Sequence, residues 1–207
     1  IETDVQVSSD GIPYIFHDET LTRLLNRDDV FSSLHSNEID NLKIFDEHSI
    51  PKLETVLRMF PDMKFQIDVK TDEVAMPALA IIQKNNAMDR VCIASFNSKR
   101  LSLVNNNYPD ICISMGPYEV AKMLLSSFGL YKKSILGNCL QIPIYEYGIK
   151  LVTKRFVKFI HSKGLKVCVW TINDEKTFKY LIDIGVDGII TDKPKLLFEV
   201  LDSATNQ

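Results

Sequence analysis

Strand-like and helix-like runs alternate along almost the whole chain, and this alternation limits the folds that the sequence can adopt. The predicted strands lie at residues 1–7, 12–17, 64–69, 90–95, 110–115, 139–142, 165–171 and 186–190. Helical patterns separate most of them and lie at 52–60, 74–87, 97–107, 117–127, 151–163, 174–184 and 194–202. A strand–helix repeat at this spacing favours a parallel sheet that is covered by helices.

The first two strands depart from this repeat, because Asp10-Gly11 between them indicates a β-hairpin. With the hairpin taken as one unit, the chain has seven β/α units, one fewer than a closed barrel. We therefore predict an α/β fold, a TIM (β/α)8 barrel that forms a single domain over residues 1–207. The chain would be N-terminally truncated, and the missing first β/α unit would lie before Ile1.

Two further features bear on the barrel prediction. Residues 18–50 are polar and irregular, and we expect them to pass over one end of the sheet. The rival fold is an open doubly wound sheet, which usually carries a glycine-rich phosphate loop after its first strand. Neither GxGxxG nor GxxxxGK[ST] occurs in the sequence, so the barrel is favoured.

The charge balance excludes some classes of partner. The chain has 24 basic and 27 acidic residues and a formal charge of -3, so it lacks a broad cationic field and nucleic acid is not an expected partner. No apolar run approaches the roughly 18 residues of a transmembrane segment. The chain opens inside a strand-like run, so an N-terminal targeting segment is not observable, and a cytoplasmic location is the expectation.

Two of the predicted strands carry acidic residues on one face. Side chains alternate along a strand, so the polar residues of the first strand share the face opposite Thr3 and Val5. The same alternation places the polar residues of 65–70 opposite Ile67. In a barrel the outward face packs on helices, so the polar faces would point inward. The residues that would converge there are Glu2, Asp4, Asp68 and Lys70.

A divalent cation would resolve the electrostatic conflict among these residues. Unpaired buried carboxylates are costly, and Lys70 can compensate only one of the three. Oxygen ligands select a hard ion, either Mg²⁺ or Ca²⁺. The alternative is that the acids are solvated at a strand edge or paired with arginines.

Two other side chains are candidates for a functional site. His17 ends the second arm of the hairpin, where it could act as a general acid or base or could be an ordinary surface histidine. Trp170, the only tryptophan, closes a strand at the point where barrel active sites lie. It could line a substrate pocket or pack in the core.

Several motifs, in order, resemble those of the glycerophosphodiester phosphodiesterase family. Residues 1–18 resemble the signature E-x-D-V…D-G-x-x-V…H-D, which Leu21 and Arg23 extend. Further similar segments lie along the rest of the chain: Ile50-Pro51-Lys52-Leu53-Glu54, Ile67-Asp68-Val69-Lys70, Ser95-Phe96, Val169-Trp170-Thr171-Ile172-Asn173 and Gly185–Pro194.

The resemblance implies a TIM barrel that hydrolyses glycerophosphodiesters to sn-glycerol 3-phosphate and an alcohol, in glycerophospholipid catabolism. It implies one divalent cation, Mg²⁺ or Ca²⁺, and residues 18–50 as an insertion over the barrel mouth. The site residues that it implies are Glu2, Asp4 and Asp68 as metal ligands, His17 as one of two catalytic histidines, Lys70 as a phosphate contact and Trp170 as a contact to the glycerol or leaving group.

The sequence departs from the family at its start, because the His-Arg-Gly motif that contains the first catalytic histidine is absent. Two alternative functions stay open, and the missing motif supports the second of them. One is a lysophospholipase D-like barrel that acts on lysophospholipids, and the other is a non-catalytic barrel that binds phosphodiesters.

Overall fold

The computed structural model describes residues 1–205. The contacts group these residues into two compact units, one from Ile1 to Gly116 and the other from Pro117 onward. The prediction of one domain over residues 1–207 stays a prediction.

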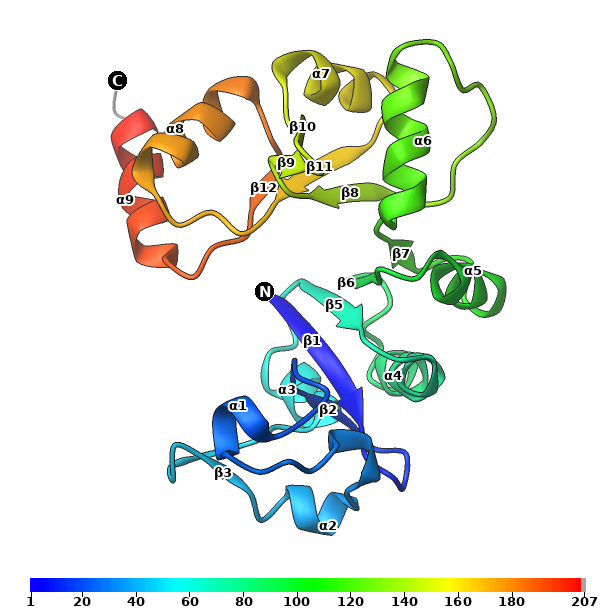
Figure 1. Ribbon diagram of the computed structural model, residues 1–207, viewed down its shortest axis with the longest axis vertical. Coiled ribbons are helices and arrows are strands. Elements are labelled where there is room, and N and C mark those ends of the chain that lie inside the picture. Colours follow the sequence, from blue (N-terminus) through cyan, green and yellow to red (C-terminus); the bar gives the residue numbers. More distant parts are fainter. Residues whose placement is uncertain (206–207) are drawn as a thin grey trace. The chain divides into compact units, whose positions relative to one another are not determined.

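The first unit is a five-stranded sheet with helices packed against it (Figure 1). Its strand order is β2-β1-β5-β6-β7. The strands are β1 (Glu2–Val7), β2 (Pro13–Ile15), β5 (Phe65–Val69), β6 (Val91–Ala94) and β7 (Cys112–Ile113). The helices that connect or flank them are α3 (Leu53–Met59), α4 (Asp72–Lys84) and α5 (Ser98–Asn107). β1, β5, β6 and β7 are parallel and β2 is antiparallel to β1, as predicted for an opening hairpin followed by β/α units.

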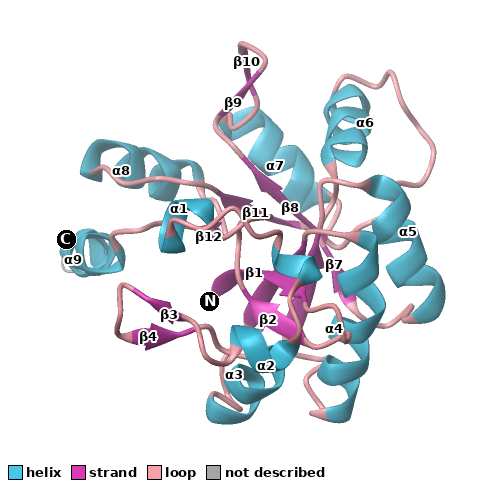
Figure 2. Cartoon of the chain, turned by 60° about the horizontal axis from the view of Figure 1, so that its bottom comes forward, coloured by secondary structure: helices cyan, strands magenta, loops and turns pink. Residues whose placement is uncertain are grey.

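The second unit repeats the same strand–helix alternation (Figure 2). Its parallel sheet has the order β12-β11-β8. The sheet strands are β8 (Cys139–Ile142), β11 (Lys166–Val169) and β12 (Gly188–Ile189). The helices are α6 (Pro117–Ser127), α7 (Lys154–Ser162), α8 (Glu175–Ile184) and α9 (Pro194–Thr205). A short hairpin of β9 (Tyr145–Glu146) and β10 (Ile149–Lys150) precedes α7.

The parallel strands of the described residues thus match the seven predicted β/α units. They form two sheets, one in each unit. A closed eight-stranded barrel, with a first unit before Ile1, stays a prediction.

The segment 18–50 is more ordered than its polar composition suggested. It contains α1 (Thr22–Leu25), the 3-10 helix η1 (Phe31–Ser33), α2 (Ser36–Ile39) and a hairpin of β3 (Lys43–Ile44) and β4 (His48–Ser49). Its apolar side chains pack on those of β2 in a separate small core whose buried members are Tyr14, Phe16, Leu21, Phe31, Leu34, Ile39 and Ile50. The segment is therefore not irregular throughout, because these apolar residues follow no regular period and still meet in space. Its passage over the barrel mouth stays a prediction.

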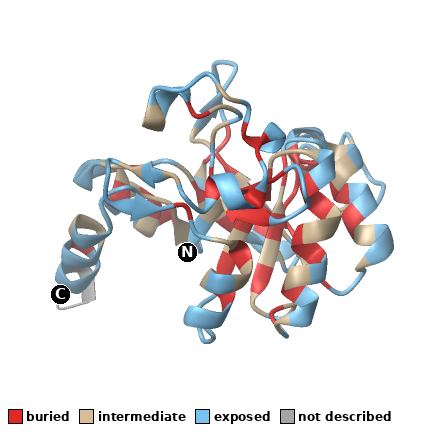
Figure 3. Ribbon diagram, turned by 90° about the horizontal axis from the view of Figure 1, so that it is seen from below, coloured by how far each residue is buried: buried red, intermediate tan, exposed pale blue. Residues whose placement is uncertain are grey.

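The main core of the first unit explains why one strand face is polar. Val5 and Val7 of β1 and Phe65, Ile67 and Val69 of β5 are buried against the helices α3, α4 and α5. Figure 3 shows buried residues along the strands and along one side of these helices. Because side chains alternate along a strand, the helix-covered face takes the apolar residues and leaves the acidic ones on the opposite face.

Two helices begin at residues other than the predicted ones, because a side chain caps the first turn of each. The predicted helix 74–87 begins earlier, at Asp72, because Thr71 Oγ1 accepts a hydrogen bond from the Val74 amide at 3.3 Å. The predicted helix 151–163 begins later, because Thr153 Oγ1 accepts from the Phe156 amide at 3.2 Å. In both cases the capping hydroxyl, rather than the apolar period, sets the first helical residue.

Candidate active site

Three charged side chains meet where β1 and β5 lie side by side. Asp4 and Asp68 are paired in the parallel register of these two strands. The Nζ atom of Lys70, which directly follows β5, lies 2.7 Å from Asp4 Oδ1 and 2.7 Å from Asp68 Oδ2. The Lys70 ammonium group therefore bridges the two aspartates, and the two carboxylate oxygens that it contacts are no farther apart than twice 2.7 Å.

Glu2 adds a third carboxylate on the same face of β1. Burial of its carboxyl group, and then the negative charges of Asp4 and Asp68, raise the pKa of Glu2. Burial also raises the pKa of Asp68, although Lys70 opposes that shift. Burial disfavours the charged form of Lys70, but its hydrogen bonds to the two aspartates outweigh this and raise its pKa. Three carboxylates beside one ammonium leave an excess of negative charge in a half-buried site.

One carboxylate oxygen of this cluster is left without a partner. Asp68 Oδ1 is buried and has no hydrogen-bond partner among the described residues. Burying a charged oxygen without a partner is costly, and a cation would compensate for it. Carboxylate oxygens are the ligands that Mg²⁺ and Ca²⁺ prefer. The donor atoms present therefore suit a divalent cation, although the carboxylate oxygens of Glu2, Asp4 and Asp68 do not all lie within 4.8 Å of one another in this structure.

His17 follows β2 and is oriented by an ion pair. Its Nδ1 lies 2.7 Å from Asp18 Oδ1. The Arg23 guanidinium donates two hydrogen bonds to Asp18, at 2.7 Å to Oδ2 and 3.1 Å to Oδ1, and these bonds hold the pKa of Asp18 below its usual range. The imidazole is 62% exposed. Because Nδ1 faces Asp18, Nε2 is left for proton transfer.

The turn that carries His17 is attached to β1, next to the acidic cluster. The side-chain amide of Gln6 donates to the main-chain carbonyls of His17 and Asp18, at 3.4 and 3.2 Å. The amide of Phe16 donates to the carbonyl of Asp4 at 3.1 Å. Five of the six predicted site residues are thus gathered in the first unit, namely Glu2, Asp4, His17, Asp68 and Lys70.

Arg100 supports the segment that carries Lys70. Its Nη1 donates to the carbonyls of Val69 and Lys70, at 2.8 and 2.9 Å, and to Ser95 Oγ at 2.9 Å. Its Nε donates to Asp72 Oδ1 at 2.7 Å, and only 11% of its side chain is exposed. Arg100 escaped prediction because it lies on α5, far along the chain from these partners, and no local pattern marks it.

Trp170 lies in the second unit, directly after β11. It is half-buried, and its main-chain amide donates to the Ile142 carbonyl at 3.3 Å. In the same loop, Asn173 Oδ1 accepts from Thr191 Oγ1 at 3.0 Å and from the Asp192 amide at 2.9 Å. These bonds join the loops that follow β11 and β12. The contact of Trp170 with a substrate stays a prediction.

Residues 1–196 match the sequence model described as the glycerophosphoryl diester phosphodiesterase family. The chain belongs to this family. Its reaction is therefore the hydrolysis of glycerophosphoryl diesters. The chain is 31% identical over 210 residues to the probable glycerophosphodiester phosphodiesterase 2 of Mycobacterium tuberculosis, an alignment that covers 97% of this chain and 78% of that protein. It is 27% identical to the glycerophosphodiester phosphodiesterase of Caldanaerobacter subterraneus, with 97% and 85% covered.

Solved structures show the same fold at lower identity. A phosphodiesterase of Oleispira antarctica, solved in complex with the product sn-glycerol-3-phosphate, superimposes with a TM-score of 0.80 at 22% identity. The superposition covers 97% of this chain and 84% of that one. A glycerophosphodiester phosphodiesterase of Parabacteroides distasonis gives a TM-score of 0.79 at 21% identity, with 99% and 84% covered. The chain thus has a TIM-barrel-like α/β fold.

Proposed function

We propose that this phosphodiesterase is metal-dependent and that it converts glycerophosphodiesters to sn-glycerol 3-phosphate and an alcohol. The observation that carries the metal dependence is the cluster of Asp4, Asp68 and Lys70, with its unpartnered Asp68 Oδ1. The substrate follows from the names of the relatives and from the glycerol phosphate bound to the Oleispira antarctica enzyme.

Glu2, Asp4 and Asp68 would hold one Mg²⁺ or Ca²⁺ ion. When bound, the ion supplies positive charge to the phosphate group and lowers the cost of its developing negative charge. Lys70 provides a second positive charge from the same cluster, and it stabilises the non-bridging phosphate oxygens. Arg100 holds the Lys70 main chain in place through its two carbonyl contacts.

His17 would transfer a proton in the reaction. The Arg23–Asp18 pair keeps Asp18 ionised, and Asp18 in turn orients the imidazole through Nδ1. A histidine held in this way can donate a proton from Nε2 to the departing alkoxide oxygen. The reverse role, in which neutral His17 accepts a proton from the nucleophile, is the alternative assignment.

A second candidate function is the cleavage of lysophospholipids. The chain is 21% identical to human lysophospholipase D GDPD3, over 98% of this chain and 76% of that protein. A non-catalytic phosphodiester-binding barrel is the third candidate. The gathering of five candidate site residues in one unit favours an enzyme over that alternative.

One assay separates these functions. The purified protein at its natural length is depleted of metal with EDTA and given glycerophosphocholine or 1-acyl-lysophosphatidylcholine, with and without Mg²⁺ or Ca²⁺. We expect metal-dependent release of sn-glycerol 3-phosphate from glycerophosphocholine. Faster turnover of the lysophospholipid would favour the second function, and no turnover of either substrate would favour the third. Equal rates with and without added metal, after verified depletion, would contradict the metal proposal.

No helix among the described residues combines the length and apolar character needed to cross a bilayer. A small-molecule glycerophosphodiester is the substrate that we propose, and the cytoplasmic location stays a prediction.

A further inference from the structure

Charges are strongly segregated along this chain. Residues 120–173 contain nine basic residues and a single acidic one, Glu146. The rest of the sequence contains 15 basic and 26 acidic residues. The cationic segment lies within the second unit. A chain with a net charge of -3 thus carries one region of strong positive charge.

Within this region, a rigid turn exposes apolar side chains. At the end of α6 the Leu130 amide donates to the Leu125 carbonyl at 3.0 Å and the Gly129 amide to the Ser126 carbonyl at 2.9 Å. With Gly129 at a φ of 75°, these bonds form a Schellman motif. Ser126 Oγ also donates to the Tyr131 carbonyl at 2.9 Å. The turn is therefore fixed, yet it leaves exposed 45% of Leu125, 56% of Phe128 and 74% of Leu130.

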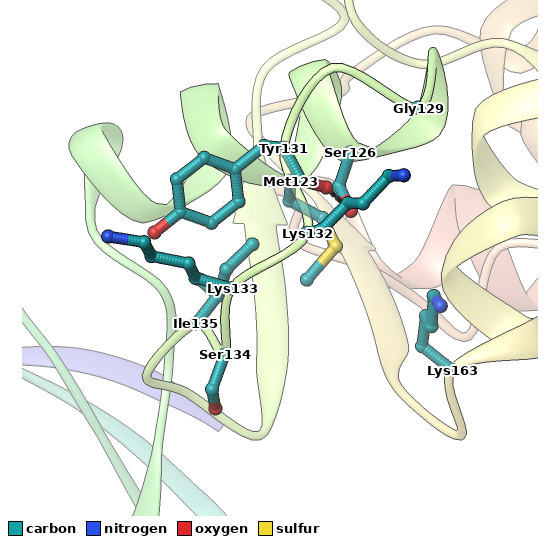
Figure 4. Close-up of a pocket in the computed structure, with 9 residues that line it drawn as sticks. All are labelled: Met123, Ser126, Gly129, Tyr131, Lys132, Lys133, Ser134, Ile135 and Lys163. Atoms are coloured by element: carbon teal, nitrogen blue, oxygen red, sulfur yellow. Dashed lines mark hydrogen bonds between the residues drawn. The ribbon is translucent and has the colours of Figure 1, made fainter.

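Cationic side chains surround this turn. A pocket of about 420 Å³ separates the loop from the end of α7 and is lined by Lys132, Lys133 and Lys163, among others. Figure 4 shows that the ammonium groups of these lysines point in different directions and do not converge on one point. Arg155 of α7 lies over the Phe128 ring at 4.8 Å from its centroid. The lysines are therefore not arranged around a single small anion.

Among the described residues of the second unit, Lys132, Lys133, Arg155 and Lys163 form no ion pair with an acidic side chain. The ion pairs that the described residues of the second unit form use other cations, namely Lys122, Lys154, His161 and Lys179. We call the exposed apolar turn and the cations around it the cationic–apolar patch, and it consists of Leu125, Phe128, Leu130, Lys132, Lys133, Arg155 and Lys163.

We propose that the cationic–apolar patch docks on the surface of an anionic lipid bilayer. Dispersed lysines and an arginine match a plane of negative headgroups, to which polybasic surfaces are attracted. The exposed Phe128 and Leu130 would enter the boundary between headgroups and acyl chains, as the apolar faces of interfacial segments do. Long cationic side chains can reach headgroups while the apolar tips enter more deeply. A nucleic acid would use the lysines but would not require the exposed apolar tips.

The test measures vesicle binding and does not depend on turnover, so its failure is distinguishable from failure of the proposed function. The protein is sedimented with phosphatidylcholine vesicles and with vesicles that also contain phosphatidylglycerol. We expect binding to the anionic vesicles that weakens with added salt, because exposed charges are screened. Lys132→Glu/Lys133→Glu and Phe128→Ser/Leu130→Ser should each weaken binding about tenfold or more.

Matched variants elsewhere in the second unit serve as controls. Lys176→Glu/Lys179→Glu reverses two exposed charges on α8, and Phe198→Ser removes a side chain on α9 that is 64% exposed. Both should bind vesicles like the unchanged protein, and all variants should melt cooperatively. Absence of binding to anionic vesicles would overturn the proposal, and so would equal losses in the controls. Binding to duplex DNA that is as tight as vesicle binding and insensitive to Phe128→Ser/Leu130→Ser would also overturn it, in favour of a general polyanion surface.

Discussion

Asp4 and Asp68 stand directly opposite each other on the parallel strands β1 and β5 and share the ammonium group of Lys70. They are 64 residues apart in the sequence. A shift of one residue in the register would place Asp4 opposite Ile67 or Val69 and would separate the two carboxylates. The acidic site therefore depends on strand pairing, and its chemistry can be tested one side chain at a time.

Loss of the shared ammonium group should impair catalysis. In Lys70→Met, we expect kcat for glycerophosphocholine to fall by about 10²–10³, the usual cost of removing a group that stabilises charge in the transition state. The measurement is the rate of sn-glycerol 3-phosphate release at saturating metal. Lys84→Met is the control, because Lys84 is an exposed lysine on α4 that pairs with Glu54. A Lys70 variant with the rate of that control would contradict the assigned role.

Loss of a carboxylate should weaken metal binding. We expect Asp68→Asn to lower the affinity for Mg²⁺ or Ca²⁺ by at least the 10–100-fold that is typical when a supporting group of a metal site is removed. Isothermal titration of the metal into the EDTA-treated protein measures this directly, without turnover. Asp62→Asn, at an exposed position before β5, controls for the change of charge. An unchanged affinity in Asp68→Asn would remove this residue from the ligand set.

His17→Ala should lower kcat by about 10²–10⁴, the range expected for a positioned acid or base. Metal affinity should change little, because His17 is not among the proposed ligands. If His17 is the acid, a nitrophenyl ester, whose leaving group needs no proton, should be affected less than glycerophosphocholine. Equal losses on both substrates would instead favour the base role. His48→Ala is the control, since this histidine is 67% exposed and lies beside Glu47.

Asp10 should make folding stability depend on pH. Its carboxylate accepts hydrogen bonds from the Ser36 hydroxyl at 2.6 Å and the Ser36 amide at 2.8 Å, and these hold its pKa well below the usual 3.8. A lowered pKa in the folded state stabilises the fold above the unfolded pKa, and this contribution is lost as pH falls through the folded pKa. At pH 7 we expect Asp10→Asn to lower the Tm by a few degrees.

Comparing the Tm of Asp10→Asn with that of the unchanged protein at acid pH tests whether the Asp10 carboxylate charge causes the difference. As pH falls below about 4, the unchanged protein should lose the Asp10 contribution while Asp10→Asn has none to lose, so the Tm difference should shrink. A difference that stays constant between pH 7 and pH 3 would show that the carboxylate charge is not responsible. Asp46→Asn, at a carboxylate in the turn between β3 and β4, is a suitable control.

The helices and strands of this fold could be predicted largely because the repeat of apolar residues that marks each one lies within that helix or strand. The period-two pattern of β1 and β5 and the apolar patterns of α5 and α6 lie in the residues of those elements themselves. The short helices and the hairpin of the segment 18–50 were not predicted, because the apolar residues that hold them together do not repeat at a regular spacing. Its small core combines Phe31 and Ile39 with Tyr14 and Phe16 of the hairpin, and no local period connects them.

The sequence by itself determined the family, the alternation of strands and helices, and the face that the acidic residues share, because all three are properties of residue order. Only the tertiary structure decided which groups meet. It paired Asp4 with Asp68 and bound Arg100 to the carbonyl of Lys70. The physical reason is that register and long-range hydrogen bonds depend on how separate segments pack together, and a pattern within one segment does not contain that information.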